Sequence, residues 1–238
     1  RLSGGKLNEV TKEDLVELIE LDGQEYLRHK TFPVNVAIIR GTYADEDGNI
    51  SLEQEPAKLD LLAAAQAAHN SGGIVIAQVK YVARANSLGS KRVSIPGVYV
   101  DAVVVDPEQM QTGEGEYNPA FSGDMEIPLK NLKPFPLSAR KVVARRAFME
   151  LKKGSVINLG FGMADGVAAV AAEEGFSDQV TMTIEQGIYG GVPAQGAIFG
   201  VASNPVAVID ECAQFDFYSG RGLDATFLGL AQADAKGN

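Results

Sequence analysis

Residues 34–82 contain VNVAIIR (34–40), then EPAKLDLLAAAQAAHN (55–70) and GIVIAQVKYV (73–82). The first and third runs are apolar and rich in β-branched residues, which is typical of buried strands. The run between them has helical spacing, and VDAVVV (100–105) predicts a third strand. Strands that alternate with a helix predict an α/β fold with a largely parallel sheet.

The helix predicted over residues 55–70 starts with Pro56, which suits a first helical turn. Four of its residues are expected to share the buried face: Leu59, Leu62, Ala63 and Gln66. The pair Gly72-Gly73 is expected to end it.

A second series of the same kind begins near Ser138, which is a candidate N-cap for a helix over 139–152. Further along, the pattern predicts strands at 155–159, 180–184, 206–211 and 225–230, and a helix at 166–174 that Gly175 closes. The stretch between the two series is rich in Pro, Gly and acidic residues and has no clean period. We therefore predict two related open α/β domains, 1–107 and 138–238, with a linker over 108–137.

Composition excludes several classes of function. Subtracting 31 acidic from 21 basic residues gives a net charge of −10, so neither nucleic acid nor an anionic membrane is an expected partner. No apolar run reaches the roughly 18 residues of a membrane span. The single cysteine, Cys212, suits a reducing cytoplasm and is expected to be buried after a strand. With two histidines, His69 near a helix end and His29 in a charged loop, a histidine metal site is not expected.

The chain also carries a weak internal similarity. ADEDGN (44–49) and ADAKGN (233–238) each follow a predicted strand, at an offset of 189 residues. Either this is a common strand-end turn, or the chain contains the end of one domain and the start of its twin. In the second case we expect the sequence to be truncated at both ends.

The sharpest local motif is TMTIEQGIYGG (181–191), in which a strand ends at Glu185 and is followed by glycines. Ligands bind at strand ends in parallel α/β sheets, and glycines there let a ligand or another backbone approach closely. Glu185 could be a nucleophile, a general base, a metal ligand or a solvated turn residue.

Two further glycine-rich turns are candidate sites. NLGFGMADG (158–166) lies between a strand and a helix, where backbone N–H groups can bind phosphate, although a tight strand–helix turn is the simpler interpretation. SGRGLD (219–224) precedes the last strand, and Arg221 could hold a carboxylate or be merely exposed. The basic residues Arg140, Lys141, Arg145 and Arg146 predict a solvated helix face.

Several runs resemble family I coenzyme A transferases, most closely the acetate/propionate group. They are TIEQGIYGGVPA (183–194), NLGFGMADGVA (158–168), GRGLDATFLGLAQADAKGN (220–238), NVAIIRGTYADEDGN (35–49) and VSIPGVYVDAVVV (93–105). EQG stands where 3-ketoacid-specific relatives have ENG or ESG, and NLGFGMAD lacks the proline of their GIGIP. The resemblance therefore favours short-chain acyl donors over 3-ketoacids.

The resemblance implies that Glu185 is the catalytic nucleophile, which carries CoA as a glutamyl thioester in a ping-pong transfer between carboxylic acids. It also implies a set of CoA contacts: Asn158, Gly160, Phe161, Gly162, Met163, Ala164, Gly187, Gly220 and Gly222. CoA is then a substrate, with no further cofactor and no metal, and the partners are acyl-CoA and small carboxylic acids. A cytoplasmic homo-oligomer is expected.

Three alternatives stay open from the sequence. The first is a 3-ketoacid CoA-transferase, and the second is a relative of sugar-phosphate isomerases in which Glu185 abstracts a proton. The third is a non-catalytic regulatory or interaction piece of such an enzyme.

Overall fold

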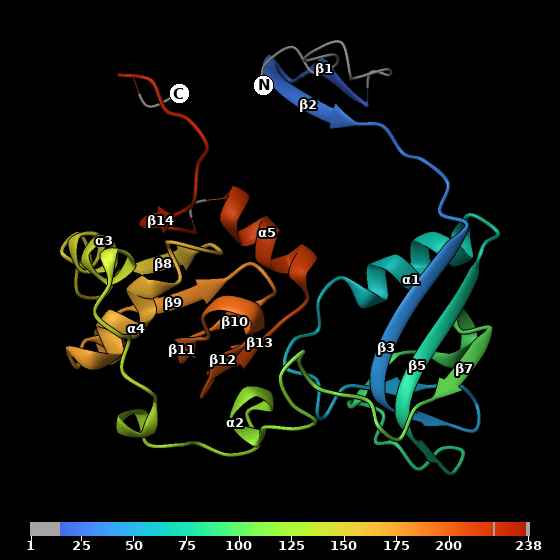
Figure 1. Ribbon diagram of the computed structural model, residues 1–238. Coiled ribbons are helices and arrows are strands. Elements are labelled where there is room, and N and C mark those ends of the chain that lie inside the picture. The colour runs from blue at the N-terminus through green and yellow to red at the C-terminus, as the bar shows by residue number, and fades with distance from the viewer. Residues whose placement is uncertain (1–14, 221, 237–238) are drawn as a thin grey trace.

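The computed structural model describes residues 15–220 and 222–236. Within them lie two α/β units, seen side by side in Figure 1, each built on a five-stranded sheet with its own buried apolar cluster. The α/β class expected from the sequence is confirmed, and both sheets are mixed. In each, three neighbouring strands are parallel and two antiparallel strands extend one edge.

The first unit has the strand order β6-β4-β3-β5-β7. Its elements are β3 (Val36–Asp45), β4 (Ile50–Ser51), α1 (Leu61–Asn70), β5 (Ile74–Ala83), β6 (Val93–Ile95), the 3-10 turn Gly97–Tyr99 and β7 (Ala102–Val105). The three predicted strands correspond to the parallel strands β3, β5 and β7. Helix α1 packs on one face of the sheet, where its side chains join those of β3 and β5 in one cluster.

The predicted start and buried face of the helix are wrong. Helix α1 begins at Leu61, so Pro56 lies outside it, and Leu59 has a φ of 53°, which no α-helix tolerates. The residues that α1 buries are Leu61, Ala65 and Ala68. The reason is that Leu59 packs against the apolar clusters of both units, which pulls the chain before Leu61 out of the helix.

The second unit has the strand order β13-β10-β9-β8-β14. Its strands are β8 (Val156–Leu159), β9 (Thr181–Ile184), β10 (Ile188–Tyr189), β13 (Ala207–Val208) and β14 (Ala225–Phe227), and β11 (Val192–Pro193) pairs with β12 (Ala202–Ser203) beside them. Its helices are α3 (Ala139–Phe148), α4 (Gly166–Glu173) and α5 (Glu211–Ser219), with 3-10 turns at Ser177–Gln179 and Gly196–Ile198. The core of this unit lies between α4 and the parallel strands β8 and β9.

Two predictions for this unit are wrong; its other predicted strands and helices form, although α3 and β14 end at Phe148 and Phe227, short of the expected 152 and 230. The strand expected over 206–211 is only the two-residue β13, and the chain then enters α5, which the sequence did not suggest. Cys212 therefore lies exposed on a helix instead of buried after a strand. Ser138 caps α3 by accepting a hydrogen bond from the Lys141 backbone N–H at 3.2 Å, as expected. Gly175, at a φ of 66°, follows the end of α4.

Ion pairs tie α3 to its surroundings. Four basic side chains of α3 each meet an acid: Arg140–Asp165, Lys141–Glu173, Arg145–Glu174 and Arg146–Glu150, at 3.1, 2.6, 2.8 and 2.5 Å. Three of these acids belong to α4 or flank it, and α3 packs directly on α4. Arg140, Arg145 and Arg146 are exposed, as predicted for a solvated face, and all four basic residues are in addition paired with an acid.

The chain between the units is held by hydrogen bonds on both sides. It includes α2 (Pro119–Ser122) and the 3-10 turn Leu129–Asn131. The buried Gln109 amide donates to the Gly41 carbonyl at 2.9 Å in the first unit. On the other side, the Asn204 N–H donates to the Ala120 carbonyl at 2.9 Å. The domain and linker limits expected from the sequence remain predictions.

A hairpin of β1 (Val16–Leu21) and β2 (Gln24–His29) precedes the first unit and was not anticipated. Figure 1 shows it joined to β3 by an extended segment. His29 is the last residue of β2, so its expected place in a loop is wrong.

The two turns with similar sequences, after β3 and after β14, each contain the same kind of hydrogen bond. Asp45 accepts a hydrogen bond from the Asp47 N–H at 3.0 Å, and Asp234 accepts one from the Lys236 N–H at 2.8 Å. Both turns follow a strand of a parallel set, β3 and β14. This geometry is that of a short Asx turn, which suits a repeat and a common strand-end turn equally well.

Candidate functional site

Glu185 lies in the tight turn that joins β9 to β10. Ile184 and Ile188 are paired across this hairpin, and the Gly187 N–H closes the turn on the Ile184 carbonyl at 3.2 Å. Strand β9 is the middle strand of its sheet, so the turn stands at the carboxyl end of the central strand. The Glu185 side chain is half-buried and, within the described residues, makes no ion pair or hydrogen bond. The turn therefore presents a free carboxylate at the edge where α/β sheets bind ligands.

Gly187 is required by the fold of this turn. It has a φ of 89°, and a Cβ there would lie 2.1 Å from the Ile209 carbonyl oxygen. The Ile209 N–H in turn donates to the Gly187 carbonyl at 2.8 Å. Gly190 and Gly191 also have positive φ and face the chain at 203–206. The sequence left two explanations for these glycines: close approach of a ligand or of another part of the chain. The described contacts are with neighbouring segments of this chain, so close packing of the chain explains the glycines.

The two groups whose pKa Glu185 influences, Glu211 and Tyr218, are acidic or neutral. Burial raises the pKa of Glu211, and the nearby carboxylates of Asp60 and Glu185 raise it further. Burial also raises the pKa of Tyr218 to about 12, with smaller contributions from Tyr189 and Glu185. An anionic substrate would thus meet negative charge at Glu185 and would need local hydrogen-bond donors to stay there.

The glycine turn after β8 stands beside the Glu185 turn, because β8 and β9 are adjacent parallel strands. Phe161 and Met163 are 64% and 43% exposed at its tip, while Ala164 is buried. Gly162 has a φ of 91°, and the Gly160 N–H bonds to the Phe227 carbonyl at 2.9 Å. The turn thus offers an apolar tip at the same sheet edge as Glu185.

Asp165, which the sequence analysis did not single out, holds this turn in place. It is fully buried and accepts hydrogen bonds from the Arg140 side chain at 3.1 Å and the Gly196 N–H at 3.2 Å. The same Arg140 nitrogen donates to the Gly162 carbonyl at 2.6 Å. An aspartate just before a predicted helix is the one sequence feature that could have singled out Asp165. Its partners Arg140 and Gly196 lie 25 and 31 residues away, so no local pattern indicates them.

Asn158 points into the fold. It is 6% exposed, its carbonyl oxygen accepts from the Tyr218 hydroxyl at 3.1 Å, and its amide contacts Thr226 at 3.5 Å. Its side chain is therefore engaged in the interior of the second unit.

The loop of Gly220 and Gly222 leads away from Glu185. Asp224 at its end accepts from the Val156 N–H at 2.8 Å, which places that end at the amino end of β8. Gly222 packs on the Phe217 carbonyl, where a Cβ would lie at 2.3 Å. Arg221 lies outside the described residues. The structure thus brings the 160–164 turn to Glu185, but it directs the 220–224 loop toward the opposite end of the parallel strands.

Two cavities flank this region. One, of about 270 Å³, lies between the units and has Gln186, Phe199 and Arg40 on its walls. Arg40 is paired there with Glu55 at 2.8 Å; burial raises the pKa of Glu55, and Arg40 opposes that rise. The smaller cavity therefore opens next to the glutamate turn and carries an internally neutralised ion pair.

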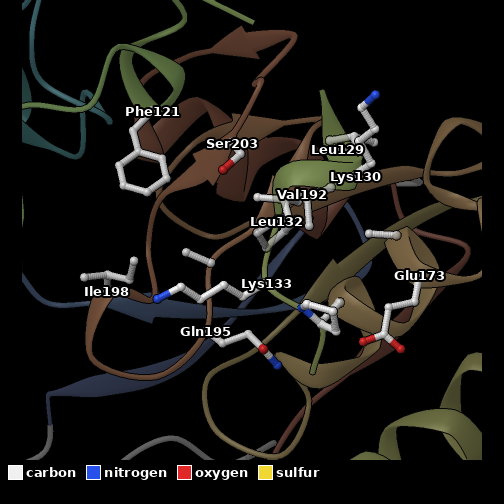
Figure 2. A pocket seen from close by; sticks show the side chains of 15 residues that line it. Phe121, Leu129, Lys130, Leu132, Lys133, Glu173, Val192, Gln195, Ile198 and Ser203 are labelled. Atoms are coloured by element: carbon white, nitrogen blue, oxygen red, sulfur yellow. The ribbon is translucent and has the colours of Figure 1, made fainter. Parts of the chain in front are cut away.

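The larger cavity, of about 650 Å³, is shown in Figure 2. Its lining residues include Phe121, Leu129 and Leu132 from the chain between the units, and Val192 of β11. Ile198 belongs to the walls of both cavities, whereas Glu185 lines neither. The 3-10 turn Gly196–Ile198 is therefore the shared wall between them.

The described ranges show neither a metal-binding cluster nor a membrane-spanning helix. In residues 15–220 and 222–236, no three His, Cys, Asp or Glu side chains gather as metal ligands would. None of the helices in that part of the chain has the length and apolar character needed to span a bilayer.

Comparison with known proteins agrees with this geometry. The family model for coenzyme A transferase matches residues 5–106. The whole chain aligns with caffeate CoA-transferase of Acetobacterium woodii at 52% identity over 241 residues, and with acetate CoA-transferase YdiF of Escherichia coli K12 at 47% over 239 residues. It spans 46% and 45% of those proteins, slightly less than half of their length.

The solved structures include a close match. The crystal structure of the acyl-CoA transferase YdiF apoenzyme from Escherichia coli O157:H7 superposes with a TM-score of 0.86 at 45% identity, over 98% of this chain and 43% of that one. A second crystal structure of that protein, described as a thioester complex with CoA, gives a TM-score of 0.85. The fold of the chain is thus the fold of the matching part of this relative.

Proposed function

The chain belongs to the coenzyme A transferase family, and from this premise we propose that its protein moves CoA from a short-chain acyl-CoA to a carboxylic acid through Glu185. The observation that carries the proposal is the Glu185 turn. A free, half-buried carboxylate stands at the carboxyl end of the central strand, on a turn whose glycine admits no side chain. A carboxylate in this setting suits nucleophilic catalysis.

The proposed reaction has two half-reactions. A Glu185 oxygen attacks the acyl-CoA carbonyl carbon, the C–S bond breaks, and CoA leaves as a thiolate with an acyl–glutamyl anhydride remaining. The thiolate attacks the glutamyl carbonyl, which releases the donor acid as a carboxylate and leaves a Glu185–CoA thioester. An acceptor carboxylate then repeats these steps in reverse order and departs as the new acyl-CoA. This is covalent catalysis with ping-pong kinetics.

This chemistry suits the groups found around Glu185. Carboxylates enter and leave, so no net proton transfer is required of the protein. Tyr218, with a pKa of about 12, stays a neutral phenol near the glutamate. Each tetrahedral centre does need oxyanion donors, worth several kcal/mol as an order of magnitude. The Gly187 N–H already donates within the turn, so it is not a free donor in this state.

For CoA itself we propose the glycine turn at 160–164 as a contact. It lies at the same sheet edge as Glu185, and the exposed Phe161 and Met163 offer apolar surface. Binding energy from distant parts of CoA can then raise the rate at the reacting carbonyl.

The relatives favour simple acids over 3-ketoacids. The proteins named for caffeate and acetate are 52% and 47% identical to this chain, whereas a mouse succinyl-CoA:3-ketoacid transferase is 24% identical over 189 residues. Acetate and caffeate are very different acids, so a panel of acceptors should contain both, together with acetoacetate.

The deciding experiment traps the covalent intermediate. The natural-length protein is incubated with propionyl-CoA and no acceptor, reduced with borohydride, and mapped by peptide mass. We expect the Glu185 carboxyl to be reduced to an alcohol only when the acyl-CoA is present. The matched control is Glu185→Gln, which is nearly isosteric and should show neither reduction nor exchange. Normal exchange by this variant would refute the nucleophile role.

A further inference from the structure

A group of three buried polar side chains and one half-buried tyrosine lies next to the Glu185 turn. Its members come from β8, β9 and α5: Asn158, Thr183, Gln214 and Tyr218. Thr183 and Gln214 are 0% exposed and Asn158 is 6% exposed. Buried polar groups of this kind are costly unless they are hydrogen-bonded, so their partners indicate what they do.

Gln214 is bonded to the backbone of the turn. Its amide nitrogen donates to the Ile184 carbonyl at 3.2 Å, and Ile184 is the residue immediately before Glu185. The same carbonyl accepts the Gly187 N–H that closes the turn. Gln214 and Gly187 therefore hold the Ile184 carbonyl from two sides, which limits rotation of the peptide that leads into Glu185.

Tyr218 connects this contact to the rest of the sheet. Its hydroxyl accepts from Gln214 at 2.7 Å, contacts the Thr183 hydroxyl at 2.6 Å and donates to Asn158 at 3.1 Å. Thr183 also donates to the Ile157 carbonyl at 2.8 Å. Two hydroxyl protons serve three contacts, and either oxygen can be the donor between Thr183 and Tyr218, so one of the two protons is shared between two acceptors. The network joins α5 to two parallel strands just below the glutamate.

The network is not the simplest way to fill this space. The Gln214 carbonyl oxygen is buried and has no hydrogen-bond partner among the described residues. Leaving such a group unpaired destabilises the folded state, and apolar side chains of similar shape would avoid that penalty. A polar network that is kept beside a reactive group despite its cost points to a role in geometry.

We propose that Gln214 and Tyr218 are positioning residues for Glu185, which hold the Ile184 carbonyl and the end of β9 so that the carboxylate keeps one orientation toward the acyl carbonyl. This inference rests on the proposed CoA-transferase reaction. Neither residue touches the reacting atoms; both act through the backbone of the turn. The network therefore governs the rate of the chemical steps and not the affinity for CoA or acid.

The test compares hydroxyl deletions at two tyrosines near Glu185. Tyr218→Phe removes the centre of the network, whereas Tyr189→Phe removes a phenol hydroxyl that has no hydrogen bond in the described residues. Gln214→Leu removes the donor to Ile184 directly. For each variant of the natural-length protein, kcat and KM are measured for propionyl-CoA and acetate. Rates are expressed per folded molecule, from near-ultraviolet circular dichroism at the assay temperature.

We expect Tyr218→Phe and Gln214→Leu to lower kcat roughly 10- to 100-fold, with KM values within about twofold of the unmodified protein, because misplacement of a reacting group lowers the rate steeply. Tyr189→Phe should leave both constants unchanged. An unchanged kcat per folded molecule in Tyr218→Phe, or an equal loss in Tyr189→Phe, would overturn the inference. Borohydride trapping in the unmodified protein separates the two proposals. If Glu185 is trapped and Tyr218→Phe is fully active, only the positioning role fails.

Discussion

Replacing Gly187 with alanine is expected to displace the glutamate turn. At a φ of 89° a residue with a Cβ is strained by about 1–2 kcal/mol. The new Cβ would lie 2.1 Å from the Ile209 carbonyl oxygen, whereas real Cβ contacts stay at 3.0 Å or more, so the turn and Ile209 must separate by at least 0.9 Å. Such overpacking costs about 1–3 kcal/mol more. The two costs together are roughly 2–5 kcal/mol, or a fall in Tm of about 10 °C for a chain of this size.

The same displacement should also lower the catalytic rate. Glu185 is two residues from Gly187 in the same turn, and a shift near 1 Å at a reacting group costs on the order of 100-fold in rate. We therefore expect Gly187→Ala to lower kcat for acyl-CoA exchange by about that factor, with little change in KM. The assay is steady-state exchange between propionyl-CoA and acetate, below the melting temperature of the variant.

Gly175→Ala is the matched control. Gly175 has a φ of 66°, and a Cβ at this position would meet no atom within 4 Å, so alanine there brings strain without a clash. It should lower Tm by a few degrees and leave kcat unchanged. If folded Gly187→Ala exchanges CoA within about threefold of the unmodified protein, the contact with Ile209 does not control the glutamate, and the reasoning is refuted.

Three further substitutions test neighbouring parts of the site and fold. Glu185→Asp should be impaired on the order of 100-fold, because loss of one methylene withdraws the carboxylate by about 1 Å; near-normal exchange would show that its position is not critical. Glu173→Gln should lower the free energy of unfolding at pH 7 by on the order of 1 kcal/mol. The hydrogen bond from Lys141 holds the pKa of Glu173 below its usual value, so this stabilisation exists above the unfolded carboxyl pKa and is lost as pH falls through the folded one. Urea unfolding should show the difference vanishing in acid, and a difference constant with pH would contradict the ion pair's role. Arg140→Gln removes the donor to the Gly162 carbonyl, and we expect a severalfold higher KM for propionyl-CoA with kcat maintained; an unchanged KM would argue against CoA contact at this turn.

The local parts of the fold could be read from the sequence because their causes are local. The apolar runs at 34–40 and 73–82 become β3 and β5, since a buried parallel strand needs a continuous apolar run. Ser138 caps α3 and Gly175 follows α4, because both depend on backbone geometry within a few residues. These signals need no knowledge of distant partners.

Predictions failed where a distant partner overrides the local pattern. The helical spacing of residues 55–60 is real, but Leu59 packs against both apolar clusters and the chain leaves the helix there. The predicted strand at 206–211 overlaps the first residue of α5, Glu211. The buried residue of that helix is Gln214, whose side chain bonds to the Ile184 carbonyl, 30 residues earlier in the chain. The exposure of Cys212 follows from that helix.

The sequence by itself determined the α/β class, the glutamate at a strand end and the glycines that its turn requires, because each follows from hydrophobic period or from backbone freedom at single positions. Only the tertiary structure decided what surrounds Glu185. It brings Tyr218 to Thr183 across 35 residues and Arg140 to Asp165 across 25, and it directs the 220–224 loop to the other end of the strands. The physical reason is that side-chain partners far apart in the chain meet only after the strands and helices pack, and no local spacing records which of them will be neighbours.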